Sequence, residues 1–142
     1  MAEAKFNYSG HYVELVTKTK KPFDSLEASS NSAVSTAFNM NSTVMIALTE
    51  RGRGTRYLAK YKPYATVLAL TKYPKVALQC GIYRSIFALV CHRDNLESAI
   101  KQLIEEMKEM KVLTVGQNIV VYSGLKDELT GTENSIKAIL IQ

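Results

Sequence analysis

The stretch TVMIALTERGRGTRYLAKYKPYATVLAL, residues 43–70, decides the fold of this chain. It begins and ends with continuous, partly β-branched apolar runs, Thr43–Leu48 and Thr66–Leu70. Between them lie a glycine-bearing loop and a pattern that predicts a short helix from Arg53 to Tyr61. Short apolar runs joined by helices are typical of buried parallel strands with crossover connections. The stretch therefore predicts a β-α-β unit.

The same alternation continues along the rest of the chain. Three more apolar runs lie at residues 86–90, 118–122 and 135–141, and further helical patterns lie at residues 24–40, 94–110 and after Pro74. The connection from Tyr122 to Ser135 is too short for a helical crossover, so we interpret it as a loop and expect an antiparallel last strand. The predicted order is helix, helix, β-α-β-α-β-α-β-β. This order indicates a three-layer α/β/α sandwich with a five-stranded, mostly parallel mixed sheet.

Two of the predicted helices carry start signals. Asp24 with Glu27, and Asp94 with Glu97, have the spacing of a capping box. The second helix also has an apolar stripe that we interpret as core, and its members are Leu96, Ile100, Leu103, Met107 and Met110.

Composition narrows the class of protein. The 142 residues carry a net charge of +5 and are 46% apolar, which is ordinary for one globular domain. No apolar run could span a membrane, and no basic stripe accompanies a nucleic-acid-binding motif, so we expect neither partner. The N-terminus has no signal-peptide pattern, and the two cysteines fit neither a disulfide scaffold nor a zinc site. We therefore expect a cytoplasmic protein.

Residues suited to catalysis are few, and we assign no catalytic or metal-binding residue. His11 and His92 are the only histidines, and neither has a nucleophile and an acidic partner at a known spacing. A small enzyme that uses Cys91 and His92 is the weakest of our hypotheses.

Two polar, glycine-bearing loops are predicted to meet at the carboxyl ends of the strands. If the first strand is central, a ligand would bind there, where the strand order reverses. Glycines, hydroxyls, arginines and a helix N-terminus in that position favour a phosphate-type ligand, although an ordinary structural turn remains an alternative. The candidate residues are Thr49, Arg51, Gly52, Arg53, Gly54, Thr55, Ser123, Lys126 and Gly131.

Three segments resemble a known family. LTERGRGTRYLAKYKP (48–63) resembles the L-T-x-x-G-x-[ST]-A-x-x-[VI]-[AS]-[RK]-Y-[RK]-P segment of the carboxy-terminal domain of pyruvate kinase. TVLALTKYPKVALQCGIYRSIFALV (66–90) is similar to the strand and R-G-[IV] region that follow it, with Ser85 in place of the glycine. VGQNIVVYSGLKDELTGTENSIKAILI (115–141) resembles the last two strands and the effector loop, and looks closest to apicomplexan members.

This resemblance implies a domain from residue 23 to 142, preceded by an N-terminal segment, residues 1–22, that is a linker or helix and partly of possible cloning origin. The whole enzyme of the family acts in glycolysis, where it transfers a phosphoryl group from phosphoenolpyruvate to ADP with Mg²⁺ and K⁺. Its catalytic barrel is missing here, so we expect an inactive regulatory domain, without a cofactor of its own, that has the other pyruvate kinase domains as partners. A free-standing phosphometabolite-binding protein of the same fold is the alternative.

The resemblance also implies an altered effector site. Thr49 and Gly52 match the family's phosphate-binding loop, but Glu50 replaces the lysine of a strongly activated vertebrate form. The arginine that holds the second phosphate in that form aligns with Ala99, and Thr55 could replace a hydroxyl one residue late. We therefore predict that fructose 1,6-bisphosphate binds weakly or not at all.

The last strand is the predicted interface. In the family this strand contributes to a homotetramer, and exposed strand edges invite pairing. We expect a dimer of this chain and a tetramer of the whole enzyme, with contacts from Ser135, Lys137, Ile139 and Ile141.

Overall fold

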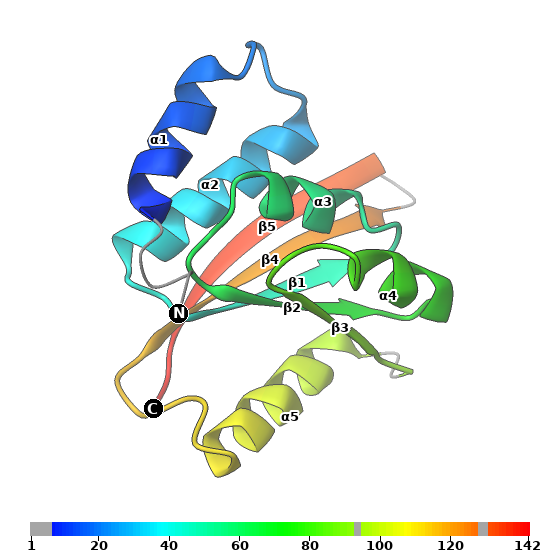
Figure 1. Ribbon diagram of the computed structural model, residues 1–142. Coiled ribbons are helices and arrows are strands. Elements are labelled where there is room, and N and C mark those ends of the chain that lie inside the picture. Colours follow the sequence, from blue (N-terminus) through cyan, green and yellow to red (C-terminus); the bar gives the residue numbers. More distant parts are fainter. Residues whose placement is uncertain (1–6, 93–94, 128–130) are drawn as a thin grey trace.

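The computed structural model describes residues 7–92, 95–127 and 131–142 (Figure 1). Its helices are α1 (Tyr8–Lys18), α2 (Ser25–Asn39), α3 (Arg53–Lys60), α4 (Pro74–Cys80) and α5 (Leu96–Glu109). Its strands are β1 (Val44–Thr49), β2 (Thr66–Thr71), β3 (Ile86–Val90), β4 (Asn118–Asp127) and β5 (Gly131–Leu140). The order of helices and strands along the chain is the predicted one.

The five strands form one sheet in the order β3-β2-β1-β4-β5. β1 pairs in parallel with both β2 and β4, β2 pairs in parallel with β3, and β5 pairs antiparallel with β4. The predicted fold class is therefore confirmed, and β1 is central. The strand order reverses between β1 and β4, which makes their carboxyl ends the expected place for a ligand.

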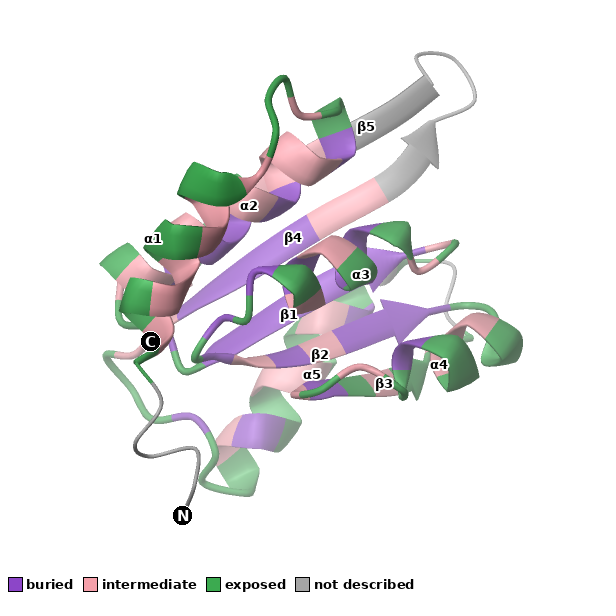
Figure 2. Cartoon of the chain, turned by 45° about the horizontal axis from the view of Figure 1, so that its top comes forward, coloured by how far each residue is buried: buried purple, intermediate pink, exposed green. Residues whose placement is uncertain are grey.

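Helices cover both faces of the sheet. α2, α3 and α4 lie on one face with α1 outside α2, and α5 lies alone on the other (Figure 1). The sheet has a hydrophobic core on each face, and alternate residues of β1 belong to different cores. Met45 and Ala47 pack toward α2 and α3, whereas Ile46 and Leu48 pack toward α5. β1 is buried along its whole length, as Figure 2 shows. This explains why its sequence is continuously apolar rather than alternating.

Helix α1 packs against the domain although it precedes residue 23. The Tyr12 hydroxyl donates a hydrogen bond to Asn31 Oδ1 over 2.5 Å, and the Tyr12 ring contacts those of Phe38 and Tyr61. Part of the N-terminal segment thus belongs to the packed structure. No helix in the described part of the chain is long and apolar enough to cross a membrane.

The helix starts and the apolar stripe are confirmed in part. Asp24 Oδ1 accepts a hydrogen bond from the amide of Glu27, as predicted. At α5, by contrast, Asn95 is the N-cap and accepts from the amides of Glu97 and Ser98, whereas Asp94 lies outside the described residues. Met110 caps the end of α5 and is 66% exposed, so its assignment to the core was wrong.

The predicted loop between Tyr122 and Ser135 is largely a β-hairpin. β4 continues to Asp127 and pairs with β5 as far as Gly131, whereas the pairing of β4 with β1 ends at Gly124. Beyond that point the two strands form a ribbon outside the sheet. Residues 125–133 contain no run of alternating apolar residues, so their sequence carries no strand signal.

Candidate functional site

A depression of about 220 Å³ lies at the carboxyl ends of β1 and β4, next to the first turns of α2 and α3. It is where the sequence predicts a ligand. It is lined by Thr49, Glu50, Arg51, Arg53, Gly54 and Gly124, together with Ser25 and Leu26 of α2 and its N-cap Asp24. Four of the nine predicted site residues therefore line it: Thr49, Arg51, Arg53 and Gly54.

The loop between β1 and α3 uses its own hydroxyl groups. Gly52 is the N-cap of α3 with a φ of 74°, a left-handed conformation that favours glycine. Its amide donates to Thr49 Oγ1 over 2.9 Å, and its carbonyl accepts from Thr55 Oγ1 over 2.7 Å. Thr55 is fully buried beside Cys80, whose sulfur lies 3.2 Å from the Thr55 hydroxyl. These hydrogen bonds hold the turn, and Thr55 faces the core rather than the depression.

Gly54 allows α3 to lie close to β4. A Cβ atom at this position would lie 2.7 Å from Cε1 of Tyr122, closer than such contacts allow. The Tyr122 hydroxyl in turn accepts a hydrogen bond from Ser30 Oγ of α2 over 3.1 Å. Gly54 therefore lets α2, α3 and β4 pack together, a structural reason that suffices for this glycine.

The charges of the depression are balanced. Arg51 and Arg53 are exposed, and two carboxylates, Asp24 and Glu50, line the same space. Asp24 also accepts a hydrogen bond from the Tyr57 hydroxyl over 3.1 Å. Burial of Tyr57 and then this hydrogen bond raise the pKa of the Tyr57 phenol. The first amides of α3 can still bind an anion, but two nearby carboxylates oppose it.

The other predicted phosphate-site residues lie elsewhere. Ser123 faces the opposite side of the sheet, where it lines an apolar groove beside α5. Lys126 and Gly131 pair with Thr132 and Asp127 in the ribbon, and the Lys126 side chain lies outside the described residues. Asp24, by contrast, was missed. Its capping pattern predicts where α2 begins, but nothing in the sequence shows that α2 begins beside the end of β1.

The predicted interface residues lie on or beyond the edge strand β5. Ser135, Lys137 and Ile139 belong to β5, and Lys137 Nζ lies 3.7 Å from Glu97 Oε1 of α5. Ile141 follows the strand and is only 2% exposed, because it packs into the core beneath α5. The edge that is open to a partner is therefore the backbone of β5 with its outward side chains.

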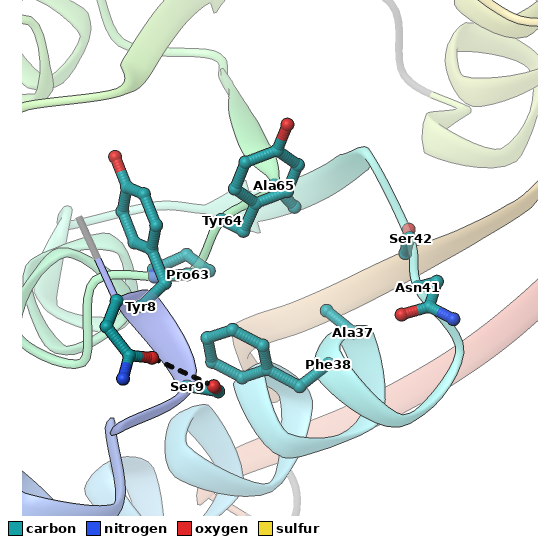
Figure 3. A pocket seen from close by; sticks show the side chains of 10 residues that line it. Tyr8, Ser9, Ala37, Phe38, Asn41, Ser42, Pro63, Tyr64 and Ala65 are labelled. Carbon is teal, nitrogen blue, oxygen red and sulfur yellow. Dashed lines mark hydrogen bonds between the residues drawn. The ribbon is translucent and has the colours of Figure 1, made fainter. Parts of the chain in front are cut away.

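A larger cavity of about 360 Å³ lies at the opposite, amino ends of the strands (Figure 3). It is lined by Asn7, Tyr8, Ser9, Ala37, Phe38, Asn41, Ser42, Pro63, Tyr64 and Ala65. None of these residues is charged. The hydroxyl of Ser42 already donates to the backbone carbonyls of Val44 and Asn118, and the rings of Tyr8 and Tyr64 pack edge to face with 5.5 Å between their centroids. The cavity therefore has few side-chain groups that could take part in catalysis.

The Cys91–His92 hypothesis gains no support from the structure. His92 is exposed in the segment after β3, and the Cys91 amide donates to the carbonyl of Thr71 over 2.8 Å. Within residues 7–92, 95–127 and 131–142, no group of three His, Cys, Asp or Glu side chains could hold a metal ion.

Comparison with known proteins gives one consistent family. A family model described as "Pyruvate kinase, alpha/beta domain" matches residues 27–139. A pyruvate kinase of Eimeria tenella is 30% identical over 142 residues, which cover 99% of this chain and 27% of that protein. Pyruvate kinase 1 of Saccharomyces cerevisiae is 29% identical over 133 residues, which cover 89% of this chain and 27% of that protein.

Solved structures agree. The structure of Cryptosporidium parvum pyruvate kinase in complex with ADP matches with a TM-score of 0.88 and 27% identity, and the match covers 99% of this chain and 28% of that one. These findings confirm the resemblance, including its apicomplexan character. The chain spans less than a third of the length of the relatives it matches.

Proposed function

The chain belongs to the family of the pyruvate kinase alpha/beta domain, and we propose that it is the carboxy-terminal regulatory and assembly domain of a pyruvate kinase. The observation that carries this proposal is the extent of the match. It covers 99% of the chain but only 27% or 28% of the whole enzymes. The rest of such an enzyme supplies the catalytic barrel, which transfers a phosphoryl group from phosphoenolpyruvate to ADP with Mg²⁺ and K⁺.

The transcript and the purified gene product test this proposal together. We expect an upstream coding region for a barrel, pyruvate kinase activity in the product of the whole gene, and no such activity in residues 1–142 alone. A transcript without a barrel would replace the proposal by the alternative, a free-standing protein that binds phosphorylated metabolites.

The regulatory part of the proposal rests on the depression between β1, β4 and α3. We propose that it is a weakened effector site. The amides at the start of α3 favour a phosphate, but Glu50 and Asp24 line the same space and repel it. The position that aligns with the second phosphate clamp of activated forms is Ala99, which is 9% exposed and can bind no phosphate.

Calorimetric titration of the chain with fructose 1,6-bisphosphate tests the weakened site. We expect no saturable heat at ligand concentrations that saturate activated members of the family. Stoichiometric, tight binding would contradict a weakened site but would leave the assignment to the family unchanged.

The assembly part rests on β5, which has a neighbour on one side only. We propose that two copies pair along this edge, with Ser135, Lys137 and Ile139 at the contact. Sedimentation of the chain across a concentration series should show a monomer–dimer equilibrium, and Ile139→Pro, which blocks strand pairing, should shift it toward monomer. A monomer at the highest concentration would contradict this contact.

A further inference from the structure

The apolar groove beside α5 has a volume of about 450 Å³. It lies on the face of the sheet that α5 alone covers, opposite the depression (Figure 1). Its apolar lining comes from one side of α5 and from three strands, and consists of Leu48, Ile100, Ile104, Val121 and Ile139. The groove and the depression share no lining residue. We call this cavity the α5 groove.

The register of β4 and β5 orders the floor of the α5 groove from polar to apolar. Ser123 of β4 is the partner of Ser135 of β5, and Val121 is the partner of Lys137. Because side chains two residues apart point to the same face of a sheet, these two pairs lie next to each other beneath α5. Ile139, two residues beyond Lys137, packs against the hydrophobic core on this face. The floor therefore has two adjacent hydroxyls at one end and apolar side chains at the other.

Helix α5 follows the same order. Its lining residues are spaced by three and four positions, so they lie on one side of the helix: Glu97, Ile100, Lys101 and Ile104. Because α5 follows β3 and leads back to the start of β4, its first turn lies near the carboxyl ends of the parallel strands. Lys137 Nζ of β5 lies 3.7 Å from Glu97 Oε1 in this first turn. The first turn of α5 thus adjoins the hydroxyl end of the floor, and Ile104 lies toward the apolar end.

The two hydroxyls of the floor are not used by the fold. Ser123 and Ser135 are both partly buried, and within the described part of the chain neither side chain has a hydrogen bond. On the opposite face, by contrast, the buried hydroxyl of Ser30 bonds to the carbonyl of Leu26 and to the hydroxyl of Tyr122. Hydroxyls that are withdrawn from solvent usually have a partner. The hydroxyls of Ser123 and Ser135 are therefore available to a ligand that enters the groove.

The charges of the α5 groove favour a ligand with one negative charge. Two exposed lysines, Lys101 and Lys137, line it together with one carboxylate, that of Glu97. The pair of Lys137 with Glu97 is weak, because its atoms are 3.7 Å apart and the two side chains are 63% and 76% exposed. Lys101 has no ion pair with any described residue. A ligand carboxylate can thus pair with Lys101 and compete with Glu97 for Lys137.

We propose that the α5 groove binds an amphipathic monocarboxylate. Its aliphatic chain lies between α5 and β5, against Ile104 and Ile139, and its carboxylate lies beside Lys101 and the two serine hydroxyls. Burial of the chain supplies binding free energy, and the polar groups fix its direction in a cavity of small-ligand size. A compact phosphate would leave the apolar lining in water. Pairing of two copies through the β5 backbone would leave this face open, because side chains stand roughly perpendicular to a sheet.

Calorimetric titration of the chain with hexanoate, octanoate and decanoate, each below the concentration at which it forms micelles, tests the apolar part of the site. We expect saturable binding of one decanoate per chain. The affinity should rise about tenfold with each two added carbons, because each buried CH₂ group contributes to binding. Decylammonium, which has the same chain and the opposite charge, should bind at least about tenfold more weakly than decanoate.

Variants of the groove test the polar part. Lys101→Glu should weaken decanoate binding about tenfold or more, because it replaces the unpaired lysine by a carboxylate. Lys20→Glu is the matched control: it changes the net charge equally, lies outside the groove and should change the affinity less than twofold. Ser135→Ala, which removes one hydroxyl and leaves the charge unchanged, should weaken binding about threefold and tests the site independently. Thermal melts of every variant separate loss of binding from loss of fold.

Four results would overturn the proposal. Equal affinities for decanoate and decylammonium would show adsorption to an apolar surface without a site for the head group. An affinity independent of chain length would show binding of the charge alone. Equal losses from Lys101→Glu and Lys20→Glu would show a response to net charge. A loss from Arg51→Glu but not from Lys101→Glu would place the carboxylate in the depression instead.

Discussion

The two sides of helix α3 differ in how their charges are matched. At the start of α3, the depression sets Arg51 and Arg53 against the carboxylates of Glu50 and Asp24. Along its exposed flank lies a groove of about 710 Å³ whose lining includes no carboxylate but four cations, Arg53, Arg56, Lys60 and Arg84. The glycine-bearing motif that points to a phosphate site lies on the balanced side. A motif thus locates a loop, but the charge of a site depends on every element that converges there.

The largest effect is expected at Gly54, the glycine that lets α3 lie close to β4. In Gly54→Ala the new Cβ would lie 2.7 Å from the enclosed ring of Tyr122, so α3 must move away from β4. We expect a loss of about 2 kcal/mol in the free energy of unfolding, measured by urea denaturation. Gly81→Ala is the control, because its nearest neighbour atom is 3.5 Å away, and it should be close to neutral. Equal stabilities would mean that α3 tolerates a shift from β4.

The next effect concerns Glu27, which joins α2 to α3. Its Oε1 accepts from the Tyr61 hydroxyl over 2.9 Å and from Lys60 over 2.5 Å. Glu27→Gln replaces two charge-assisted hydrogen bonds by weaker ones, and we expect a loss of about 1.5 kcal/mol in the free energy of unfolding. Glu105→Gln, which removes an exposed pair with Lys108, should change it by less than about 0.5 kcal/mol.

The same contact makes stability depend on pH. Burial, followed by the hydrogen bond to Glu27, raises the pKa of Tyr61 from 10.0 to about 12. Because the pKa is higher in the folded state, this contribution is complete below the pKa of the unfolded chain and is lost as pH rises from about 10 to 12. The urea midpoint should fall over this interval, and less steeply in Glu27→Gln. An unchanged slope would mean that burial alone raises this pKa.

The sequence predicted the fold better than the site, and single residues show why. The order of helices and strands follows from long apolar runs, and it does not change if the end of a run is misplaced by a residue or two. The site depends on side-chain direction, which reverses at each step along a strand. Tyr122 packs under α2 and α3, so Ser123 must face α5, away from the depression. Because residues 122–135 were predicted as a loop, this alternation was not considered. The position of Asp24 beside the depression depends on how α2 crosses the sheet, which the sequence does not show.

The smallest effect tests the comparison between the two sites most directly. Glu50→Lys replaces a carboxylate of the depression by a cation and leaves the lining of the groove along α3 unchanged. The depression then has three cations and one carboxylate around the first amides of α3. We expect its affinity for fructose 1,6-bisphosphate to rise about tenfold, equivalent to about 1.4 kcal/mol, in calorimetric titrations at low salt.

Glu50→Gln, which removes the charge without adding another, separates repulsion from attraction and should give a smaller gain. In the double variant Glu50→Lys, Arg56→Glu, the gain at the depression should remain, because Arg56 lines the groove along α3 and not the depression. Loss of the gain would mean that both sites respond to one shared field rather than to their own side chains. Retention would show that the balance of charge at the end of β1, and not the loop backbone, keeps the effector site weak.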